Sequence, residues 1–119
     1  MVYHEVGGAD MITMHLFYTG KDDAAERFAQ EMLDSGMVNR IRAEEGNLAY
    51  AYYRSLDDPH TVLLVDAWEN QEALDRHHAS PMMAHIMELR ERYDLHMRAE
   101  RLVTEDAAAS GDDRRFIRE

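Results

Sequence analysis

Cysteine is absent from the sequence, and lysine is represented only by Lys21. Without cysteine the chain has no disulfide, no thiolate nucleophile and no zinc ribbon. The basic residues number 13 against 24 acidic ones, which gives a formal net charge of −11. Phosphate neutralisation requires clustered basic side chains, so neither nucleic acid nor an anionic membrane is expected as a partner.

Long apolar runs are also missing. No stretch approaches the roughly 20 apolar residues of a transmembrane helix, and the start of the chain lacks the apolar segment of a signal peptide. We therefore expect a cytoplasmic protein. The sequence has no glycine-rich phosphate loop, no G-x-S-x-G and no H-E-x-x-H, so it does not support a nucleotide-binding, serine-hydrolase or zincin function.

Residues 11–103 carry the patterns of a single domain. A chain of 119 residues with 45% apolar content is the right size for one core. Residues 1–10 contain two glycines and no periodicity, and we predict a flexible leader there. Residues 104–119 are acidic and then basic, and we predict a mobile tail.

Four strand patterns and two helical patterns alternate along this domain. One helix is expected from Asp23, with an interruption at Ser35-Gly36, and another from Asn70 to about Tyr93, with a kink at Ser80-Pro81. Asn70 and Ser80 are predicted N-caps, and Asp23 with Glu26 resembles a capping box. The strands are expected at 11–19, 48–55, 61–68 and 95–103. The core-facing stripes are Ala25, Phe28, Ala29, Met32 and Leu33, then Met82, Ile86, Leu89 and Tyr93.

The resulting order, β-α-β-β-α-β, predicts an α+β fold of the ferredoxin-like type, with an antiparallel sheet and its helices on one face. The opposite face then requires a cover. The near-continuous apolar run Val62–Val65 favours burial on both faces, and so short a chain leaves much of its surface wet. We therefore predict a homodimer in which sheet packs on sheet.

The stretch from Thr61 to Met87 is the strongest candidate for a pocket wall. A buried strand ends at Trp68, the only tryptophan, and the following helix carries His77 and His78. Trp68 either stacks on a planar substrate or is a core aromatic whose N–H is satisfied. Neighbouring helix residues diverge by about 100°, so only one imidazole can face inward, and we favour His77. That imidazole either deprotonates a phenol or is a structural helix-face histidine.

Two tyrosines on another strand extend the candidate site. Tyr50 and Tyr52 share a strand face, where their hydroxyls either contact a polar substrate or simply pack in the sheet. Arg54 ends that face and is expected to pair with Asp66 or Glu69.

Further candidates lie on the first strand and the last helix. His15 is a pocket candidate whose face is not settled by the pattern. Met82, Met83 and Met87 either line an adaptable apolar pocket or form part of the core stripe.

A metal site is the main chemical alternative. His77, His78, His85 and Glu88 lie on one helical segment. Pro81 separates the two pairs, however, and no second cluster completes a coordination shell. We therefore expect no metal.

Two runs of residues resemble a known family. The first is RAEEGNL at 42–48, which leads through Tyr50 to YRSLDDP at 53–59. The second contains Asp66, Trp68, His77 and Ser80-Pro81. In their order and spacing these residues resemble the antibiotic biosynthesis monooxygenase (ABM) superfamily, and most of all its quinol monooxygenase-like branch, over residues 11–102.

This resemblance implies a dimeric α+β barrel. It also implies, as in characterised members, oxygenation of electron-rich aromatic or quinol substrates without metal or flavin. Asp66 stands where the family usually has Glu, and Met82 stands where the branch often has His. The first strand has no Asn and no His falls at the haem-ligating position, which counts against the haem-degrading members of the family.

Two functions are compatible with these observations. The first is a cofactor-independent monooxygenase of a quinol or polyphenol, with His77 as base and with Trp68 and Tyr50 fixing the ring. The second is a non-catalytic small-molecule binder or stress-associated dimer that uses the same pocket. In either case the expected ligand is a small aromatic or quinone-like molecule. The candidate substrate-binding residues are Tyr50, Tyr52, His15, Asp66, Met83 and Met87, and the catalytic candidates are His77 and Trp68.

Overall fold

The computed structural model describes residues 10–103, 115, 116 and 118. Residues 1–9 of the predicted leader, and nearly all of the predicted tail at 104–119, lie outside the described residues. In the described part, strands and helices alternate as predicted, with the second half of each helical segment forming a helix of its own. The elements are β1 (Ile12–Thr19), α1 (Ala24–Asp34), α2 (Met37–Arg42), β2 (Asn47–Arg54), β3 (Thr61–Trp68), α3 (Gln71–His78), α4 (Pro81–Arg92) and β4 (His96–Val103).

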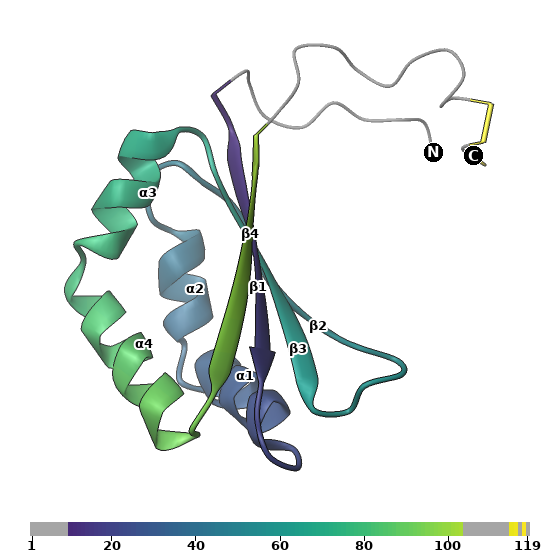
Figure 1. Cartoon of the computed structure of the whole chain (residues 1–119). Helices are drawn as coiled ribbons and strands as arrows, with labels where there is room; N and C mark the ends of the chain where they lie inside the picture. The colour runs from purple at the N-terminus through teal and green to yellow at the C-terminus, as the bar shows by residue number, and fades with distance from the viewer. Residues whose placement is uncertain (1–9, 104–114, 117, 119) are drawn as a thin grey trace.

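The strands form one antiparallel sheet in the order β2-β3-β1-β4. The helices all lie on one side of this sheet, and the other side carries no helix from the described residues (Figure 1). This is the ferredoxin-like α+β fold that the order of patterns predicted.

The core fills the space between the helices and the sheet. Most side chains of β1 and β3 on the helix-facing side are buried, because strand residues two apart point the same way. α1 buries four of its five predicted core residues, whereas Leu33 is 43% exposed, so the predicted stripe was one residue too wide. In α4, Ile86 and Leu89 are buried, and Met82 and Tyr93 pack against the core.

The helix ends confirm some predicted caps and contradict others. The Asn70 side chain accepts a hydrogen bond from the Ala73 N–H at 2.9 Å, as predicted. Asp23 and Ser80 occupy the N-cap positions, but neither side chain makes a capping hydrogen bond, so those two predictions were wrong. The Asp23 backbone is not in the extended conformation that a capping side chain needs. The Ser80 hydroxyl is instead buried without a partner among the described residues.

The two predicted interruptions separate each helical segment into two helices. Gly36 has φ +82°, a left-handed conformation that glycine adopts without strain. It therefore separates α1 from α2. Ser80 is extended, as the residue before a proline usually is, so α3 and α4 are separate helices rather than one kinked helix.

The side of the sheet without helices is here called the open face. Its large apolar side chains are half-buried or exposed, and they are Phe17, Tyr53, Leu63, Val65 and Leu102. Every residue of β4 is exposed, including those on the side of the helices. No helix in the described part of the chain is long and apolar enough to cross a membrane.

Candidate active site

The end of β3 and the helix that follows it bring Trp68 and His77 together. Asn70 caps α3 directly after the strand, and the helix then turns back over the sheet. The rings of Trp68 and His77 stack with their centroids 4.8 Å apart and their planes 27° apart. His77 is 3% exposed and Trp68 is fully buried, whereas His78 is exposed. Helix geometry predicted that only one of these two histidines faces inward, and the structure shows that it is His77, the one we favoured.

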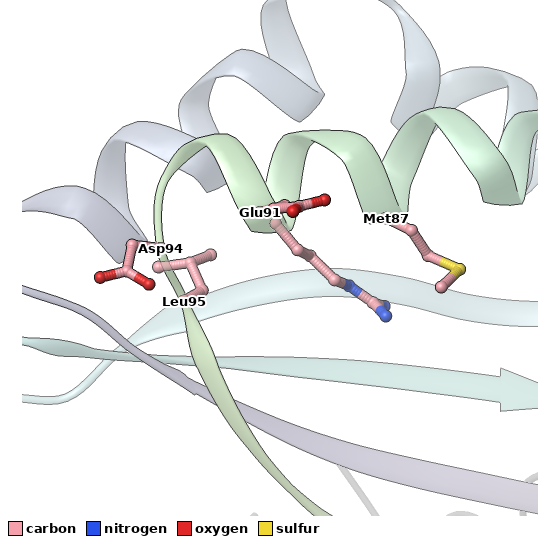
Figure 2. Close-up of a pocket in the computed structure, with 5 residues that line it drawn as sticks. Met87, Glu91, Asp94 and Leu95 are labelled. Atoms are coloured by element: carbon pink, nitrogen blue, oxygen red, sulfur yellow. The ribbon is translucent and has the colours of Figure 1, made fainter.

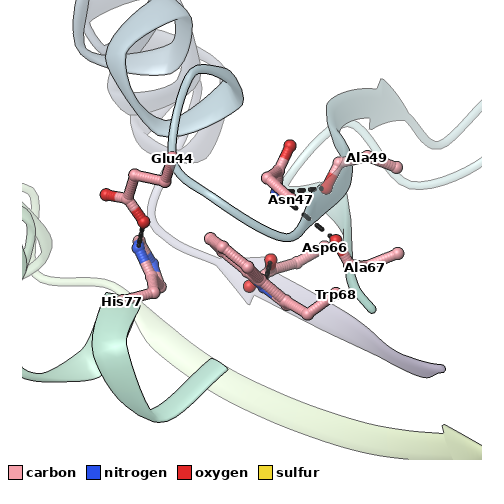
Figure 3. A network of polar contacts seen from close by, with 7 residues as sticks. All are labelled: Glu44, Asn47, Ala49, Asp66, Ala67, Trp68 and His77. Atoms are coloured by element: carbon pink, nitrogen blue, oxygen red, sulfur yellow. Dashed lines mark hydrogen bonds and ion pairs between the residues drawn. The ribbon is translucent and has the colours of Figure 1, made fainter. Parts of the chain in front are cut away.

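Glu44 orients the imidazole of His77. A Glu44 carboxylate oxygen lies 2.9 Å from Nδ1 of His77 (Figure 3). Because a carboxylate only accepts hydrogen bonds, the proton of the neutral imidazole lies on Nδ1 and the lone pair on Nε2. Sequence reasoning did not single out Glu44, although it stands inside the RAEEGNL run that carried the family resemblance.

The turn that carries Glu44 packs closely against α3. Gly46 has φ +86°, and a Cβ at this position would lie only 2.5 Å from the Cβ of Ala73. Asn47 then begins β2, where its side-chain amide donates to the carbonyls of Ala49 and Ala67 across an irregularity in the strand pairing (Figure 3). A glycine and an asparagine therefore hold the Glu44 turn beside His77.

Asp66 holds the indole ring of Trp68 through a hydrogen bond. Asp66 and Trp68 are two residues apart on one strand face, and the indole N–H donates a hydrogen bond to the Asp66 carboxylate. Asp66 is only 4% exposed. Burial raises the pKa of Asp66 to about 6, although the Trp68 hydrogen bond and the positive charge of Arg90 act in the opposite direction.

The protonation of His77 follows from two opposing influences. Burial lowers the pKa of His77, because the imidazolium ion loses its hydration, while the charge and the hydrogen bond of Glu44 raise it. The net direction is downward. A neutral imidazole with one nitrogen held by Glu44 is able to accept a proton on Nε2 at neutral pH.

Tyr50 lies next to the ring of His77, and Tyr52 and Tyr18 lie further along the helix-facing side of the sheet. Tyr50 pairs across the sheet with Asp66, and its ring centroid lies 6.3 Å from that of His77 and 6.0 Å from that of Tyr52. The buried hydroxyl of Tyr52 interacts with that of Tyr50, and the buried hydroxyl of Tyr18 interacts with the guanidinium of Arg90. Burial raises the pKa of Tyr18 to about 12 and also raises the pKa of Tyr50 and of Tyr52, so all three remain protonated donors.

Some predicted site residues lie elsewhere. His15 belongs to the open face, 3.8 Å from Glu100, and the sheet separates it from His77. Met83 packs against the core, and Met87 is 58% exposed along α4. Arg54 pairs with Glu26 at 3.3 Å, so the predicted pairing with Asp66 or Glu69 was wrong.

Two residues near the site were not identified from the sequence. These are Tyr18 and Arg90, and nothing in the order of residues shows which arginine of a helix faces the sheet. The guanidinium carbon of Arg90 lies 5.2 Å from the ring centroid of Tyr18. In the described part of the chain, no group of three or more His, Cys, Asp or Glu side chains is arranged to hold a metal ion.

Comparisons with known proteins agree with this fold and with these motifs. The chain is 27% identical over 67 residues to the Bacillus subtilis protein named putative monooxygenase YcnE, an alignment that covers 56% of this chain and 68% of YcnE. Rv0793 from Mycobacterium tuberculosis is 25% identical with a TM-score of 0.64, over 83% of this chain and 99% of that one.

SnoaB, a cofactor-independent oxygenase from Streptomyces nogalater, has a TM-score of 0.68 at 15% identity, over 83% of this chain and 97% of its own. At that identity the likeness shows the fold alone. The model of the family described as antibiotic biosynthesis monooxygenase matches residues 11–89. Because this match spans more than half of the chain, from β1 into α4, the protein belongs to the antibiotic biosynthesis monooxygenase family.

Proposed function

We propose that this protein is a monooxygenase that oxidises a quinol or polyphenol between the sheet and the helices, without metal or flavin. The observation that carries the proposal is the buried polar group formed by Glu44, His77, Trp68 and Asp66. This group lies beside the buried Tyr50, whose ring centroid is 6.3 Å from that of His77. Family membership supports the reaction class, and similarity to a cofactor-independent oxygenase is consistent with it.

His77 is the proposed base. Glu44 holds Nδ1, burial keeps the ring neutral, and Nε2 takes the phenolic proton of the substrate. The resulting quinolate is more electron-rich than the quinol, so it transfers electrons to dioxygen more readily. Removal of water from the site strengthens each of these electrostatic interactions.

The aromatic residues are the proposed clamp for the substrate ring. Trp68 is held in one orientation by its hydrogen bond to Asp66 and by its stacking on His77. Tyr50 lies next to both. The hydroxyls of Tyr18 and Tyr52 are protonated donors, and they provide hydrogen bonds to substrate oxygens.

The reaction balances with dioxygen as the only co-reactant. A quinol and one O₂ yield a hydroxyquinone and one water. The substrate supplies four electrons: two leave as the quinol becomes a quinone, and two more as a ring C–H becomes C–OH. One oxygen atom enters the ring, and the other leaves as water with the two remaining protons.

The open face supports a proposal about assembly. Phe17, Leu63 and Val65 remain partly exposed in the single chain, although their neighbours Val62 and Leu64 are buried. We propose that a second copy of the chain covers this face, so that the sheets pack together in a homodimer.

Oxygen consumption tests the proposed reaction. An oxygen electrode would follow a panel of hydroquinones, without added metal or flavin, using the wild type, His77→Ala and His78→Ala. Loss of the base is expected to lower the rate by at least about a hundredfold, while the exposed His78 serves as the matched control. If quinones quench Trp68 fluorescence but no variant consumes oxygen, the protein is a binder and the proposed reaction is wrong.

A further inference from the structure

Ring-shaped side chains form a continuous series that begins at the candidate active site. The series starts with the stack of Trp68 on His77, whose centroids are 4.8 Å apart, and continues from His77 to Tyr50 at 6.3 Å. The next ring, that of Tyr52, lies 6.0 Å from Tyr50. Separations of this size are those of aromatic rings in contact.

Phe28 of α1 extends the series to the C-terminal end of α4. Its ring centroid lies 6.3 Å from that of Tyr52 and 6.3 Å from that of Tyr93, the residue that follows α4. Tyr93 is half-buried, whereas Trp68 and Phe28 are fully buried. The whole series, from Trp68 to Tyr93, is here called the aromatic row. It crosses the core from a buried indole to a tyrosine at the surface.

Each end of the aromatic row is hydrogen-bonded to a carboxylate. The indole N–H of Trp68 donates to Asp66, and the hydroxyl of Tyr93 donates to Glu31 at 2.6 Å. An oxidised indole or phenol is a much stronger acid than the neutral side chain. A carboxylate that already accepts the hydrogen bond can therefore take the proton as the electron leaves. Either end can lose an electron and a proton together and become a neutral radical.

Tyr18 is a side branch of the aromatic row rather than its end point. Its ring lies 5.2 Å from that of the same phenylalanine, but its hydroxyl interacts with the guanidinium of Arg90. A cation neither accepts a phenolic proton nor stabilises an electron-deficient ring. The Arg27 guanidinium lies 5.7 Å from the ring centroid of Tyr93, but transfer of the proton to Glu31 leaves Tyr93 uncharged. An electron vacancy is therefore more stable at Tyr93 than at Tyr18.

The surface end of the aromatic row adjoins a groove. Tyr93 directly precedes Asp94 and Leu95, which line a cavity of about 340 Å³ beside α4 (Figure 2). None of the described residues that line this cavity belongs to the stack at the other end of the row. Reductants in solvent can therefore reach the end at Tyr93, whereas Trp68 has no exposed surface.

We propose that the aromatic row is an electron-transfer path that protects the candidate active site from oxidising radicals formed within it. His77 and Phe28 are bridges in this path, and the residues that carry the electron vacancy are Trp68, Tyr50, Tyr52 and Tyr93. The oxidant is an alkoxyl radical formed from the substrate and dioxygen. The inference rests on the proposed function for this oxidant, but its test uses no substrate, so the two proposals can fail separately.

Electrons and protons balance along this path. The alkoxyl radical takes one electron from Trp68 and one proton from solvent, and it becomes an alcohol. Each ring is then refilled by the next carrier, so all the carriers except Tyr93 regain their starting state. Tyr93 ends as a phenoxyl radical with its proton on Glu31. A thiol in solvent then returns one hydrogen atom to the tyrosine, and Glu31 releases its proton.

Laser photoionisation tests the path without substrate. Trp68 is the only tryptophan in the sequence, so ultraviolet light that tyrosine does not absorb removes an electron from Trp68 alone. The indolyl and phenoxyl radicals absorb at different wavelengths. In the wild type, indolyl absorbance should be replaced by phenoxyl absorbance at a rate independent of protein concentration. Tyr93→Phe should lose most of the phenoxyl absorbance, because Tyr50 and Tyr52 donate to no carboxylate among the described residues. The matched variant Tyr53→Phe should keep it, because Tyr53 lies on the open face, outside the aromatic row.

Other outcomes would overturn the proposal. It is wrong if the indolyl radical of the wild type decays without phenoxyl absorbance, if the transfer rate depends on protein concentration, or if Tyr93→Phe and Tyr53→Phe give equal yields. Circular dichroism establishes that each variant is folded. If Tyr93→Phe does not fold, Glu31→Gln keeps the ring and removes the proton acceptor, and an unchanged transfer rate in that variant contradicts the path. Transfer to Tyr93 in a protein that consumes no oxygen with hydroquinones would retain the path and reject the proposed reaction.

Discussion

Two histidines on opposite faces of one sheet each have a glutamate neighbour, yet their surroundings differ. His77 lies beneath the helices, 3% exposed, with Glu44 at 2.9 Å. His15 lies on the open face, 31% exposed, with Glu100 at 3.8 Å. Of the two histidines only His77 stacks on an aromatic ring, that of Trp68, whose N–H in turn donates to the buried Asp66. The same residue types therefore form a candidate base on one face and a partly exposed surface contact on the other, and burial makes the difference.

The largest expected effect distinguishes the two faces at adjacent residues of β3. Leu64 is fully buried toward the helices, whereas Leu63 lies on the open face. Leu64→Asp buries an unpaired carboxylate and should remove at least about 4 kcal/mol of stability, a large part of the roughly 5–15 kcal/mol that stabilises a small domain. Leu63→Asp should remain folded but fail to dimerise. Urea denaturation measures the first effect, and analytical ultracentrifugation measures the second.

A wild type that is monomeric at micromolar concentration would contradict the proposed dimer. Leu33→Asp is the matched control for an exposed leucine away from the open face, and it should keep the oligomeric state of the wild type.

The next effect concerns the buried carboxyl group of Asp66. Its pKa is raised from 3.8 to about 6, so the neutral form stabilises the fold at low pH and this advantage is lost as pH rises through 6. Asp66→Asn cannot ionise and should be more stable than the wild type above that pH, by up to about 3 kcal/mol. The gain should shrink to nothing toward pH 4. Urea unfolding at a series of pH values measures this difference in the free energy of unfolding, and the exposed Asp75→Asn is the control.

The fluorescence of Trp68 should report the protonation of His77 but not that of His15. Because the two rings stack, protonation of His77 should quench the indole as pH falls, with a midpoint below the ordinary histidine value of about 6.5. His77→Gln should abolish this transition, while His15→Gln and His78→Gln should retain it. An Asp66→Asn background removes the contribution of the neighbouring carboxyl. Quinone binding should weaken over the same pH range, because protonated His77 has no free lone pair.

The smallest expected effect belongs to the two glutamates. Glu44 raises the pKa of His77 through its charge and hydrogen bond, so Glu44→Gln should move the fluorescence midpoint of His77 further down. Glu100→Gln, its counterpart on the open face, should leave that midpoint unchanged. Equal midpoints in the wild type and both variants would show that Glu44 does not orient the imidazole.

Much of the fold was predictable because local patterns were consistent with one another. These patterns depend on interactions within a few residues. They are the alternation in the strands, the Asn70 cap, the break at Gly36 and the proline after Ser80. The predicted side-chain caps at Asp23 and Ser80 were wrong. Backbone angles and burial, rather than residue type, decide whether a side-chain oxygen reaches a backbone N–H of the first helical turn. Arg54 forms an ion pair with Glu26 on α1. This partner is distant in sequence, so no strand pattern identifies it.

The sequence alone determined the order of elements, the family motifs and the fact that only one of His77 and His78 can face inward, because each depends on spacing along the chain. Only the tertiary structure decided that Glu44 holds His77, that Asp66 receives the Trp68 N–H in a buried site, and that Arg90 faces the sheet while Arg92 faces outward. It also placed His15 on the far side of the sheet. These outcomes depend on the packing of segments distant in sequence, and it is burial within that packing that shifts the pKa of Asp66 and of His77.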